Sequence, residues 1–347
     1  MTTRSTWTRS ISVLSVGGLL IALTGCMSTS EISGSGSGSG SNSGGIAFAT
    51  LDQGSAWYNY GATIGSQIED AVDGTKVEVL PYSGGIGNPE LVASGEAQIA
   101  TSFSAVTAWA HEGLGGTPFE DEPLDNLRML VGGIDQYYFG PIAPANAAFD
   151  SLDEVVDGEL GIGIVSQPRG SLGDIGTNMV LEAYGAGTDD IESWGGNFEP
   201  TSTDVATTAI GDRKADLWIQ AITAGHPGIT ELAQTSDIKI LPISDDAVEA
   251  LSDFGLTPAT LPGGTFRGQD DDVQLVGFNT SIIASTDLDD ETAYEITKAI
   301  VESADALASA NAGMAGFDPA LAASEEMTSG VPLHPGAERY YKEAGLL

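Results

Sequence analysis

Residues 160–187 read LGIGIVSQPRGSLGDIGTNMVLEAYGAG, and this order of apolar and small residues predicts a buried strand, a turn and a helix. The strand follows from apolar residues between Leu160 and Val165, with glycines that leave room for close packing. Pro168 and Gly170 mark the turn. The helix is indicated by apolar residues at helical spacing, which are Ile175, Met179, Val180 and Ala183.

The centre of this stretch, Arg169-Gly170-Ser171, has the composition of an anion site. The first free N–H groups of a helix lie beside the positive end of its dipole and suit a carboxylate, phosphate or sulfate. An arginine beside them adds a two-pronged hydrogen bond. Two interpretations remain open at this point. Either these residues bind an anion, or Ser171 caps the helix beside a solvated arginine.

Residues 1–25 have the pattern of a secretory signal peptide. Arg4 and Arg9 precede an apolar run, Ile11–Leu23, that is too short for a permanent membrane-spanning helix. Leu23-Thr24-Gly25-Cys26 resembles a lipobox, in which cleavage leaves Cys26 as the lipid-bearing first residue. Residues 26–45, with a Ser/Gly tract from position 33, predict a flexible tether. We therefore expect an extracytoplasmic protein that is anchored to the outer face of the membrane through Cys26.

Composition limits the function further. The chain has 347 residues, of which 41% are hydrophobic, and this is enough for two domains with ordinary cores. Cys26 is the only cysteine, so the mature chain forms no internal disulfide. With 12 basic and 49 acidic residues the formal charge is −37, which excludes nucleic acid as a partner. The acidic residues are spread along the chain and lysine is scarce, a pattern that indicates adaptation to high salt.

The order of predicted elements indicates an α/β protein. Strand, small-residue loop and helix recur three times, with strands at 46–50, 77–80 and 98–102, and this alternation builds a largely parallel sheet. A second α/β unit follows the opening stretch, and the apolar strand at 273–283 is long enough to cross between domains. A long helix is expected over 290–310. We predict two α/β lobes joined by two crossover segments, with a ligand cleft between them. Lobe I comprises 46–138 and 272–347, and lobe II comprises 139–271.

Motifs for catalysis or metal binding are not found in the sequence. It contains no His-x-x-x-His, no Gly-x-Ser-x-Gly and no phosphate-binding P-loop motif, so we expect no enzymatic activity, no cofactor and no metal. The acidic runs at 270–272 and 289–291 do not have the spacing of a calcium loop, and we interpret them as solvated surface. His111, His226 and His334 are scattered, and His334 lies in a Pro/Gly turn where a structural role is expected.

Several short motifs, in order from about Phe48 to Leu347, resemble the TAXI group of extracytoplasmic receptors. These receptors are the solute-binding subunits of one class of TRAP transporters. The motifs are Gly54-Ser55-Ala56-Trp57-Tyr58, Ser83-Gly84-Gly85 with Asn88, Leu91-Val92-Ala93-Ser94-Gly95-Glu96-Ala97, Asn126-Leu127-Arg128, Gly170-Ser171, the run Leu261–Asp270, the run Tyr294–Ala299 and the run Pro332–Tyr341.

The resemblance implies a type II periplasmic-binding fold. It also implies a monomeric receptor that captures a small anionic solute, such as an amino acid or another carboxylate, and delivers it to a TRAP-type permease. An ABC-transporter receptor of the same fold, or a sensor or enzyme built on it, is the alternative. Phe103-Ser104-Ala105 stands where the family often has Gln-Ser-Asp, so solute identity is not carried over. Arg169 and Gln167 stand where small residues or proline are more usual. Arg169 is thus either a substitute anchor or an exposed neighbour of the site.

The predicted ligand-binding residues follow strands in loops that face the expected cleft. Serine hydroxyls there either donate to a carboxylate or only cap a helix. Aromatic residues, Tyr137 among them, either wall the apolar part of a ligand or pack in the core. Asn88 either fixes its loop or contacts ligand, and Gln220 suits a polar head group. The complete predicted set is Gly54, Ser55, Trp57, Tyr58, Ser83, Asn88, Ser104, Tyr138, Arg169, Gly170, Ser171 and Gln220.

Overall fold

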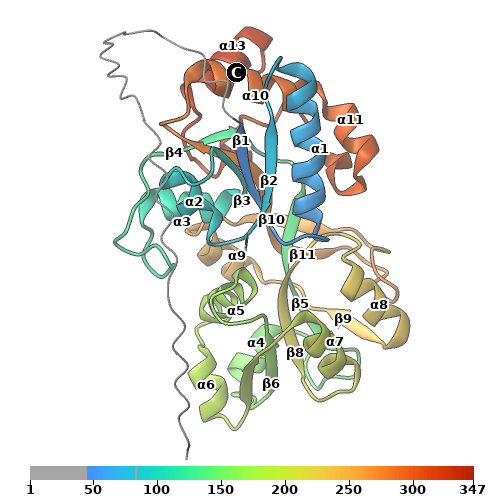
Figure 1. Ribbon diagram of the computed structural model, residues 1–347. Helices are drawn as coiled ribbons and strands as arrows, with labels where there is room; N and C mark the ends of the chain where they lie inside the picture. The colour runs from blue at the N-terminus through green and yellow to red at the C-terminus, as the bar shows by residue number, and fades with distance from the viewer. Residues whose placement is uncertain (1–44, 83) are drawn as a thin grey trace, which may run out of the picture. The chain divides into compact units, whose positions relative to one another are not determined.

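A computed structural model describes residues 45–82 and 84–347 (Figure 1). The expected signal peptide, most of the tether, the lipid site Cys26 and the predicted ligand residue Ser83 lie outside the described residues. In the described part of the chain, no helix combines the length and the apolar character that crossing a membrane requires.

Lobe I is built around a sheet with strand order β2-β1-β3-β11-β4. The first three strands are parallel, and β11 runs antiparallel to β3 and β4. These strands are β1 (Ile46–Thr50), β2 (Val77–Pro81), β3 (Ile99–Phe103), β4 (Leu127–Val131) and β11 (Val273–Ser285). The helices of this lobe are α1 (Ala56–Ala71), α2 (Asn88–Ala93), α3 (Ser104–Glu112), α10 (Asp290–Glu302), α11 (Ala304–Ala310), α12 (Glu325–Thr328) and α13 (Pro335–Ala344), with a 3-10 turn at Ala312–Gly316.

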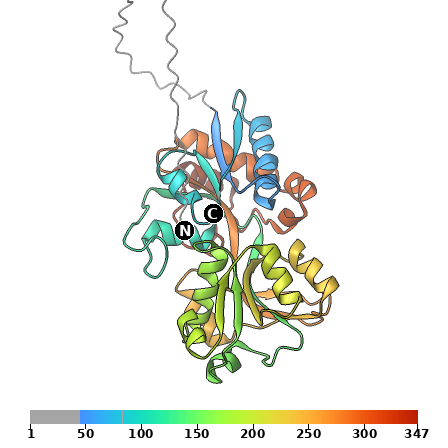
Figure 2. The same cartoon turned by 60° about the horizontal axis from the view of Figure 1, so that its bottom comes forward.

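Lobe II is built around a second sheet with the order β10-β11-β5-β8-β6-β7, in which β9 also pairs with β5. Figure 2 shows this lobe in green and yellow beside the blue and orange elements of lobe I. Its strands are β5 (Gln136–Pro144), β6 (Gly163–Ser166), β7 (Asn197–Pro200), β8 (Leu217–Ile222), β9 (Ile238–Ile240) and β10 (Thr257–Leu261). Its helices are α4 (Leu152–Asp157), α5 (Leu172–Ala183), α6 (Thr188–Ser193), α7 (Thr203–Gly211), α8 (Pro227–Thr235) and α9 (Asp245–Ser252).

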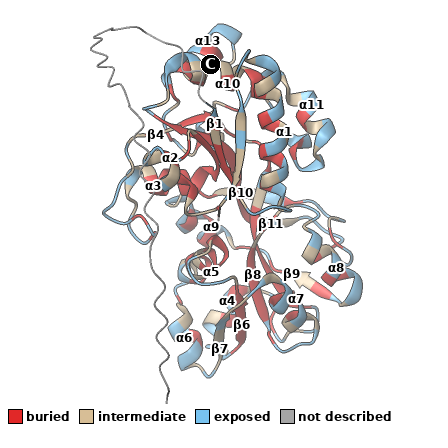
Figure 3. Cartoon of the chain, viewed as in Figure 1, coloured by how far each residue is buried: buried red, intermediate tan, exposed pale blue. Residues whose placement is uncertain are grey.

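Strand β11 belongs to both sheets. Its first half pairs with β10 and β5, and its second half pairs with β3 and β4. The last 11 of its 13 residues are buried, which explains why apolar residues occur on both faces of the strand, with Asn279, Thr280 and Ser281 as buried polar residues among them. Figure 3 shows the buried residues concentrated along the strands of both sheets. The predicted strand that crosses between the two α/β units is therefore confirmed.

The two crossover segments lie side by side and are hydrogen-bonded to each other. Ile134 N donates to the carbonyl of Thr280 over 2.9 Å, and Thr280 N donates to the carbonyl of Asp135 over 3.3 Å. Gly133 N donates to Asn279 Oδ1 over 2.8 Å. Residues 132–135 and 279–280 thus form a two-stranded connection, at which we expect the lobes to hinge.

The structure corrects several sequence-based boundaries. The helix expected over 290–310 is two helices, because Ser303 leaves helical geometry between α10 and α11, with φ −97° and ψ 12°. The strand expected from Leu160 begins at Gly163. The elements that were not predicted are α6, β7, α9, β10, α12 and the 3-10 turn at Ala312–Gly316. Strand β7 is an edge strand without a buried residue, and β10 begins Thr257-Pro258, so neither shows the apolar alternation of a strand.

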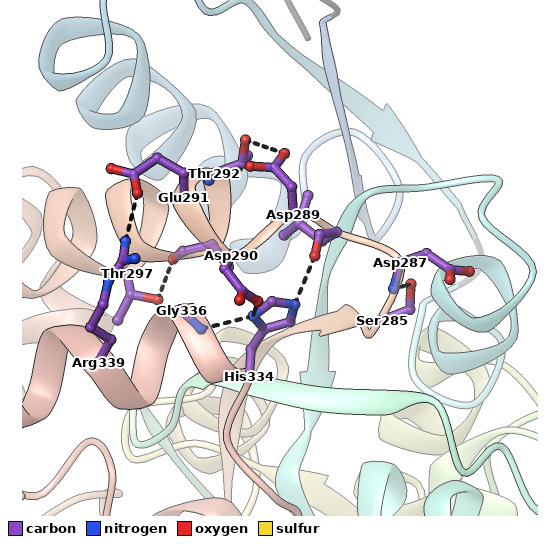
Figure 4. Close-up of polar contacts among 12 residues, drawn as sticks. Ser285, Asp287, Asp289, Asp290, Glu291, Thr292, Thr297, His334, Gly336 and Arg339 are labelled. Carbon is purple, nitrogen blue, oxygen red and sulfur yellow. Dashed lines mark hydrogen bonds and ion pairs between the residues drawn. The ribbon is translucent and has the colours of Figure 1, made fainter. Parts of the chain in front are cut away.

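His334 has the structural role that the sequence indicated (Figure 4). It is the N-cap of α13, where its Nδ1 accepts a hydrogen bond from Gly336 N over 3.2 Å. Its Nε2 contacts the carbonyl oxygen of Leu288 at 3.0 Å. Both ring nitrogens are used when the ring is neutral with its proton on Nε2. Burial lowers the pKa of His334, which favours this neutral form.

Candidate functional site

A cavity of about 790 Å³ lies between the lobes. Its walls are the loops that follow β1, β2 and β3 in lobe I and the loops that follow β6 and β8 in lobe II, with Tyr137 between them. The lining residues of lobe I are Leu51, Gly54, Ser55, Ala56, Trp57, Gly84, Gly85, Ile86, Gly87 and Phe103. Those of lobe II are Gln167, Arg169, Gly170, Ser171, Leu172, Gly173, Gln220, Ala221, Thr223, His226 and Pro227. We refer to this cavity as the cleft.

The cleft brings together more than half of the ligand residues predicted from the sequence. Those that line it are Gly54, Ser55, Trp57, Arg169, Gly170, Ser171 and Gln220. Four others, Tyr58, Asn88, Ser104 and Tyr138, are not among its lining residues. Gln167, Thr223 and His226 line the cleft without having been predicted. For Thr223 and His226 the sequence signal is Pro227, because a proline a few residues after a strand end marks a helix start at the same edge of the sheet.

Two serines in the cleft, Ser55 and Ser171, cap the helices that begin there. Ser55 Oγ accepts a hydrogen bond from Tyr58 N at the start of α1, over 3.1 Å. Ser171 Oγ accepts one from Asp174 N at the start of α5, over 3.3 Å. The capping interpretation is therefore confirmed for both residues. It does not compete with binding, because a hydroxyl that accepts through its oxygen keeps its own O–H to donate.

Arg169 extends from a turn that Asp174 holds in place. The buried carboxylate of Asp174 accepts hydrogen bonds from Gly170 N over 2.9 Å and from Ser166 Oγ over 3.2 Å. Gly170 has φ +79°, a conformation that favours glycine. Arg169 is exposed, and its Cζ lies 5.8 Å from the ring centroid of Phe198. No carboxylate of the described residues lies within 4 Å of its guanidinium nitrogens.

The charge of the cleft is opposite to that of the chain as a whole. None of the described residues that line it is an aspartate or glutamate, and Arg169 is the one lining residue with a permanent charge. The chain carries 49 acidic residues and 12 basic ones. The positive ends of the dipoles of α1, α5 and α8 are in the same walls. This arrangement favours a negatively charged ligand.

Uncharged polar side chains form part of the lobe II wall. Gln167 Oε1 accepts a hydrogen bond from Thr203 Oγ1 over 3.2 Å, while its Nε2 has no partner among the described residues. His226 Nδ1 is also without a partner there, and burial lowers the pKa of His226, so the ring is neutral at pH 7. Gln220 is 7% exposed. These groups suit hydrogen bonds to an uncharged part of a ligand.

Aromatic rings form the floor of the cleft. The ring of Phe103 lies 4.5 Å from that of Trp57 and 4.9 Å from that of Tyr137, measured between centroids. The indole N–H of Trp57 donates to Thr280 Oγ1 over 2.9 Å, so this floor is attached to the crossover segment of β11. Phe103 therefore supplies apolar surface to the cleft.

The predicted residues outside the cleft have other positions. Asn88 is buried, and its Nδ2 donates to the carbonyls of Thr50 and Thr101, so it joins the ends of β1 and β3. Ser104 is 1% exposed at the start of α3. Tyr58 is partly exposed on α1, and Tyr138 lines a second cavity.

The sequence profile of the NMT1-like family matches residues 48–345, and the chain belongs to this family. Its fold is similar to that of MatC from Rhodopseudomonas palustris with bound malate, at 11% identity and a TM-score of 0.51, over 86% of this chain and 96% of that one. It is also similar to a TctC solute-binding protein from Polaromonas, at 10% identity and a TM-score of 0.51, over 87% of this chain and 98% of that one. The predicted two-lobe periplasmic-binding fold is therefore confirmed.

Proposed function

We propose that the chain is an extracytoplasmic receptor that captures a small anionic solute between its lobes and delivers it to a membrane permease. The observation that carries this proposal is the reversal of charge at the cleft. A strongly acidic chain has an interlobe cavity whose described lining contains no carboxylate and one arginine. Long-range repulsion from the acidic surface disfavours anions, so a local site of this kind is needed to hold one.

Groups on both lobes contact the bound solute. The carboxylate of the solute lies at the N-termini of α1 and α5, where the Ser55 and Ser171 hydroxyls donate to it. Arg169 adds its charge from the lobe II side. An apolar middle part packs on Trp57 and the rings beside it. Since these groups belong to different lobes, a bound solute favours the closed arrangement over the open one.

The solute class that fits this wall is a small carboxylate, amino acids included, with a second polar end that needs no charged partner. Gln167, Gln220 and His226 supply neutral donors and acceptors for that end. MatC, whose fold is similar, has bound malate, which is also a small carboxylate but is charged at both ends.

The remaining parts of the proposal rest on the sequence motifs. As a TAXI-type receptor, the protein works with a TRAP permease. The lipobox at Cys26 and the tether that follows it anchor the monomeric protein to the outer face of the cell membrane. The scattered acidic residues suit a high-salt environment. We retain lobe limits of 46–138 with 272–347 for lobe I, and 139–271 for lobe II.

The test is a thermal-shift and calorimetric screen of the full-length chain in molar KCl against amino acids, keto acids, dicarboxylates and inorganic anions. A ligand that binds only the folded state raises the melting temperature, and the rise grows with the logarithm of its concentration above the dissociation constant. We expect such a shift with one class of carboxylate. No shift with any anion of the panel would contradict the proposal.

A further inference from the structure

A second cavity, of about 330 Å³, lies at the crossover segments. It shares only Ala56 and Thr223 with the lining of the cleft. Its described walls include Asp135 from the first crossover, Asn279 from the second, and Asp318 from the segment after the 3-10 turn. We refer to it as the hinge cavity.

Asp135 is the buried polar group of this cavity. It is 6% exposed, and Thr280 N donates to its Oδ1 over 3.3 Å. Its Oδ2 is buried and has no donor in regular hydrogen-bond geometry among the described residues, although the hydroxyl of Tyr60, which lines the same cavity, lies close enough to act on the carboxylate. A carboxylate oxygen that loses its water and gains no donor is costly, so an atom of this kind in a cavity wall indicates a missing ligand.

The other walls supply negative charge and oxygen atoms. None of the described lining residues is a lysine, arginine or histidine. Asp318 is exposed and lines the same cavity. Gln136 directs its amide nitrogen to the carbonyls of Tyr137 and Phe278, which leaves its Oε1 as a further acceptor.

We propose that the hinge cavity binds a small monovalent cation such as potassium or sodium, with Asp135 Oδ2 as its charged ligand. One positive charge compensates one buried carboxylate, and oxygen atoms are the ligands that such hard cations take. A calcium site is less suited, because calcium in proteins takes six to eight oxygen ligands, several of them from carboxylates. The described residues contain no group of three or more acidic, histidine or cysteine side chains arranged for a metal.

The position of the site gives the cation a structural role. Asp135 and Thr280 belong to the two crossover segments, and Trp57, in the floor of the cleft, donates to Thr280 Oγ1. A cation at Asp135 is therefore bound where the two segments meet. The proposal does not depend on the nature of the solute or on the transport function.

The first experiment is crystallography of the full-length chain grown in rubidium chloride. Rubidium replaces potassium and is located by its anomalous scattering without a variant of the protein. We expect an anomalous peak in the hinge cavity, in contact with Asp135 Oδ2. Density there without an anomalous signal, or an empty cavity, would overturn the proposal.

The second experiment measures the melting temperature while KCl replaces choline chloride at constant ionic strength and without solute. Wild type is expected to show a saturable rise, because a cation that binds the folded state stabilises it. Asp135→Asn should abolish this rise. The control is Asp157→Asn, which removes the same charge from an exposed position on α4 and should leave the rise unchanged. An equal rise in wild type and Asp135→Asn would contradict the site.

Asp318→Asn keeps the test valid if the Asp135 variant does not fold. Asp318 is exposed, so its substitution should leave the fold intact, and its charge attracts the cation from the cavity wall. We expect the half-saturating potassium concentration to rise roughly two- to fivefold. A response identical to that of wild type would count against the cavity as the binding site.

Discussion

Asp174 in lobe II and Asp135 at the crossover are nearly equal in burial, at 7% and 6% exposed, but they differ in their hydrogen bonds. The carboxylate of Asp174 accepts from Gly170 N and Ser166 Oγ, and so it holds the turn from which Arg169 extends. Asp135 keeps one oxygen without a partner in the described structure. Burial of a charge is therefore not by itself a sign of binding. The informative property is the hydrogen-bonding capacity that the protein leaves unused.

The two carboxylates also differ in what their surroundings do to the ionised form. Burial raises the pKa of Asp135 to about 6, although hydrogen bonding from Thr280 and Tyr60 acts in the opposite direction. A carboxyl with this pKa is ionised for the most part at neutral pH, in a place where its negative charge is only partly compensated. Substitutions at the two positions should thus change stability with opposite signs.

The largest effect is expected for Asp174→Ala, which removes the acceptor of two hydrogen bonds and leaves Gly170 N without its partner. The free energy of unfolding should fall by about 3 kcal/mol, measured by urea denaturation in KCl. Asp157→Ala is the matched control on an exposed helix end and should change it by less than about 0.5 kcal/mol. A change for Asp174→Ala as small as that of the control would remove the distinction between the two aspartates.

Asp135→Asn should have the opposite sign when choline replaces alkali cations. The amide keeps an acceptor for Thr280 N but carries no charge to bury, so the free energy of unfolding should rise by about 2 kcal/mol at pH 8. The same denaturation experiment measures it. The interpretation would be wrong if this variant were less stable than wild type under those conditions.

Arg169→Gln tests whether the turn held by Asp174 serves to place a positive charge against the solute. The substitution keeps hydrogen-bond donors but removes the charge, and the affinity for the anionic solute should fall at least tenfold, or about 1.4 kcal/mol, in calorimetry. Arg213→Gln, away from the cleft, makes the same chemical change as a control. Unchanged affinity for Arg169→Gln would make Arg169 an exposed neighbour of the site.

The smallest change in stability is expected at His334. This is a third buried titratable group, and unlike Asp135 it has a hydrogen-bond partner for each of its polar side-chain atoms. Its pKa is lower in the folded than in the unfolded chain, since burial disfavours the charged ring. As pH falls below the ordinary value of 6.5, the unfolded chain takes up the proton first, so stability decreases with falling pH. Protonation also removes the acceptor for Gly336 N.

The contribution of His334 is measured as the difference in unfolding free energy between pH 8 and pH 5.5, in wild type and in His334→Asn. Asparagine can still cap α13 but does not titrate in this range. Wild type should lose about 1 kcal/mol more than the variant, the typical cost of a lost helix cap. If the unfolding free energy depended on pH equally in both proteins, protonation of His334 would not contribute to the loss of stability.

The sequence predicts the fold well where the apolar pattern is continuous. Strand β11 and helix α5 follow directly from their patterns, because burial on both faces or on one helical face requires those residues. Edge strand β7 has no buried residue and so leaves no pattern. Helix α9 buries Ala247, Val248 and Leu251 at helical spacing, a pattern that the sequence-based prediction missed. The break at Ser303 depends on how α10 and α11 pack, and no proline or glycine marks it in the sequence.

Site residues were predictable where a helix begins with serine or glycine, as at Ser55 and Ser171. They were not predictable where strand pairing decides which way a side chain points. Tyr137 lines the cleft while its neighbour Tyr138 lines the hinge cavity, because successive residues of a strand face opposite sides. The importance of Asp135 depends on a hydrogen bond that is not made, and such an absence has no sequence signal. The predicted lobe limits stay predictions.

Among the described elements β1 comes first and α13 last, and both belong to lobe I. Lobe II is inserted between them, and its two ends leave through one pair of adjacent segments. A pulling force applied at β1 and α13 would therefore be carried by lobe I alone, and lobe II would bear no load until lobe I ruptured.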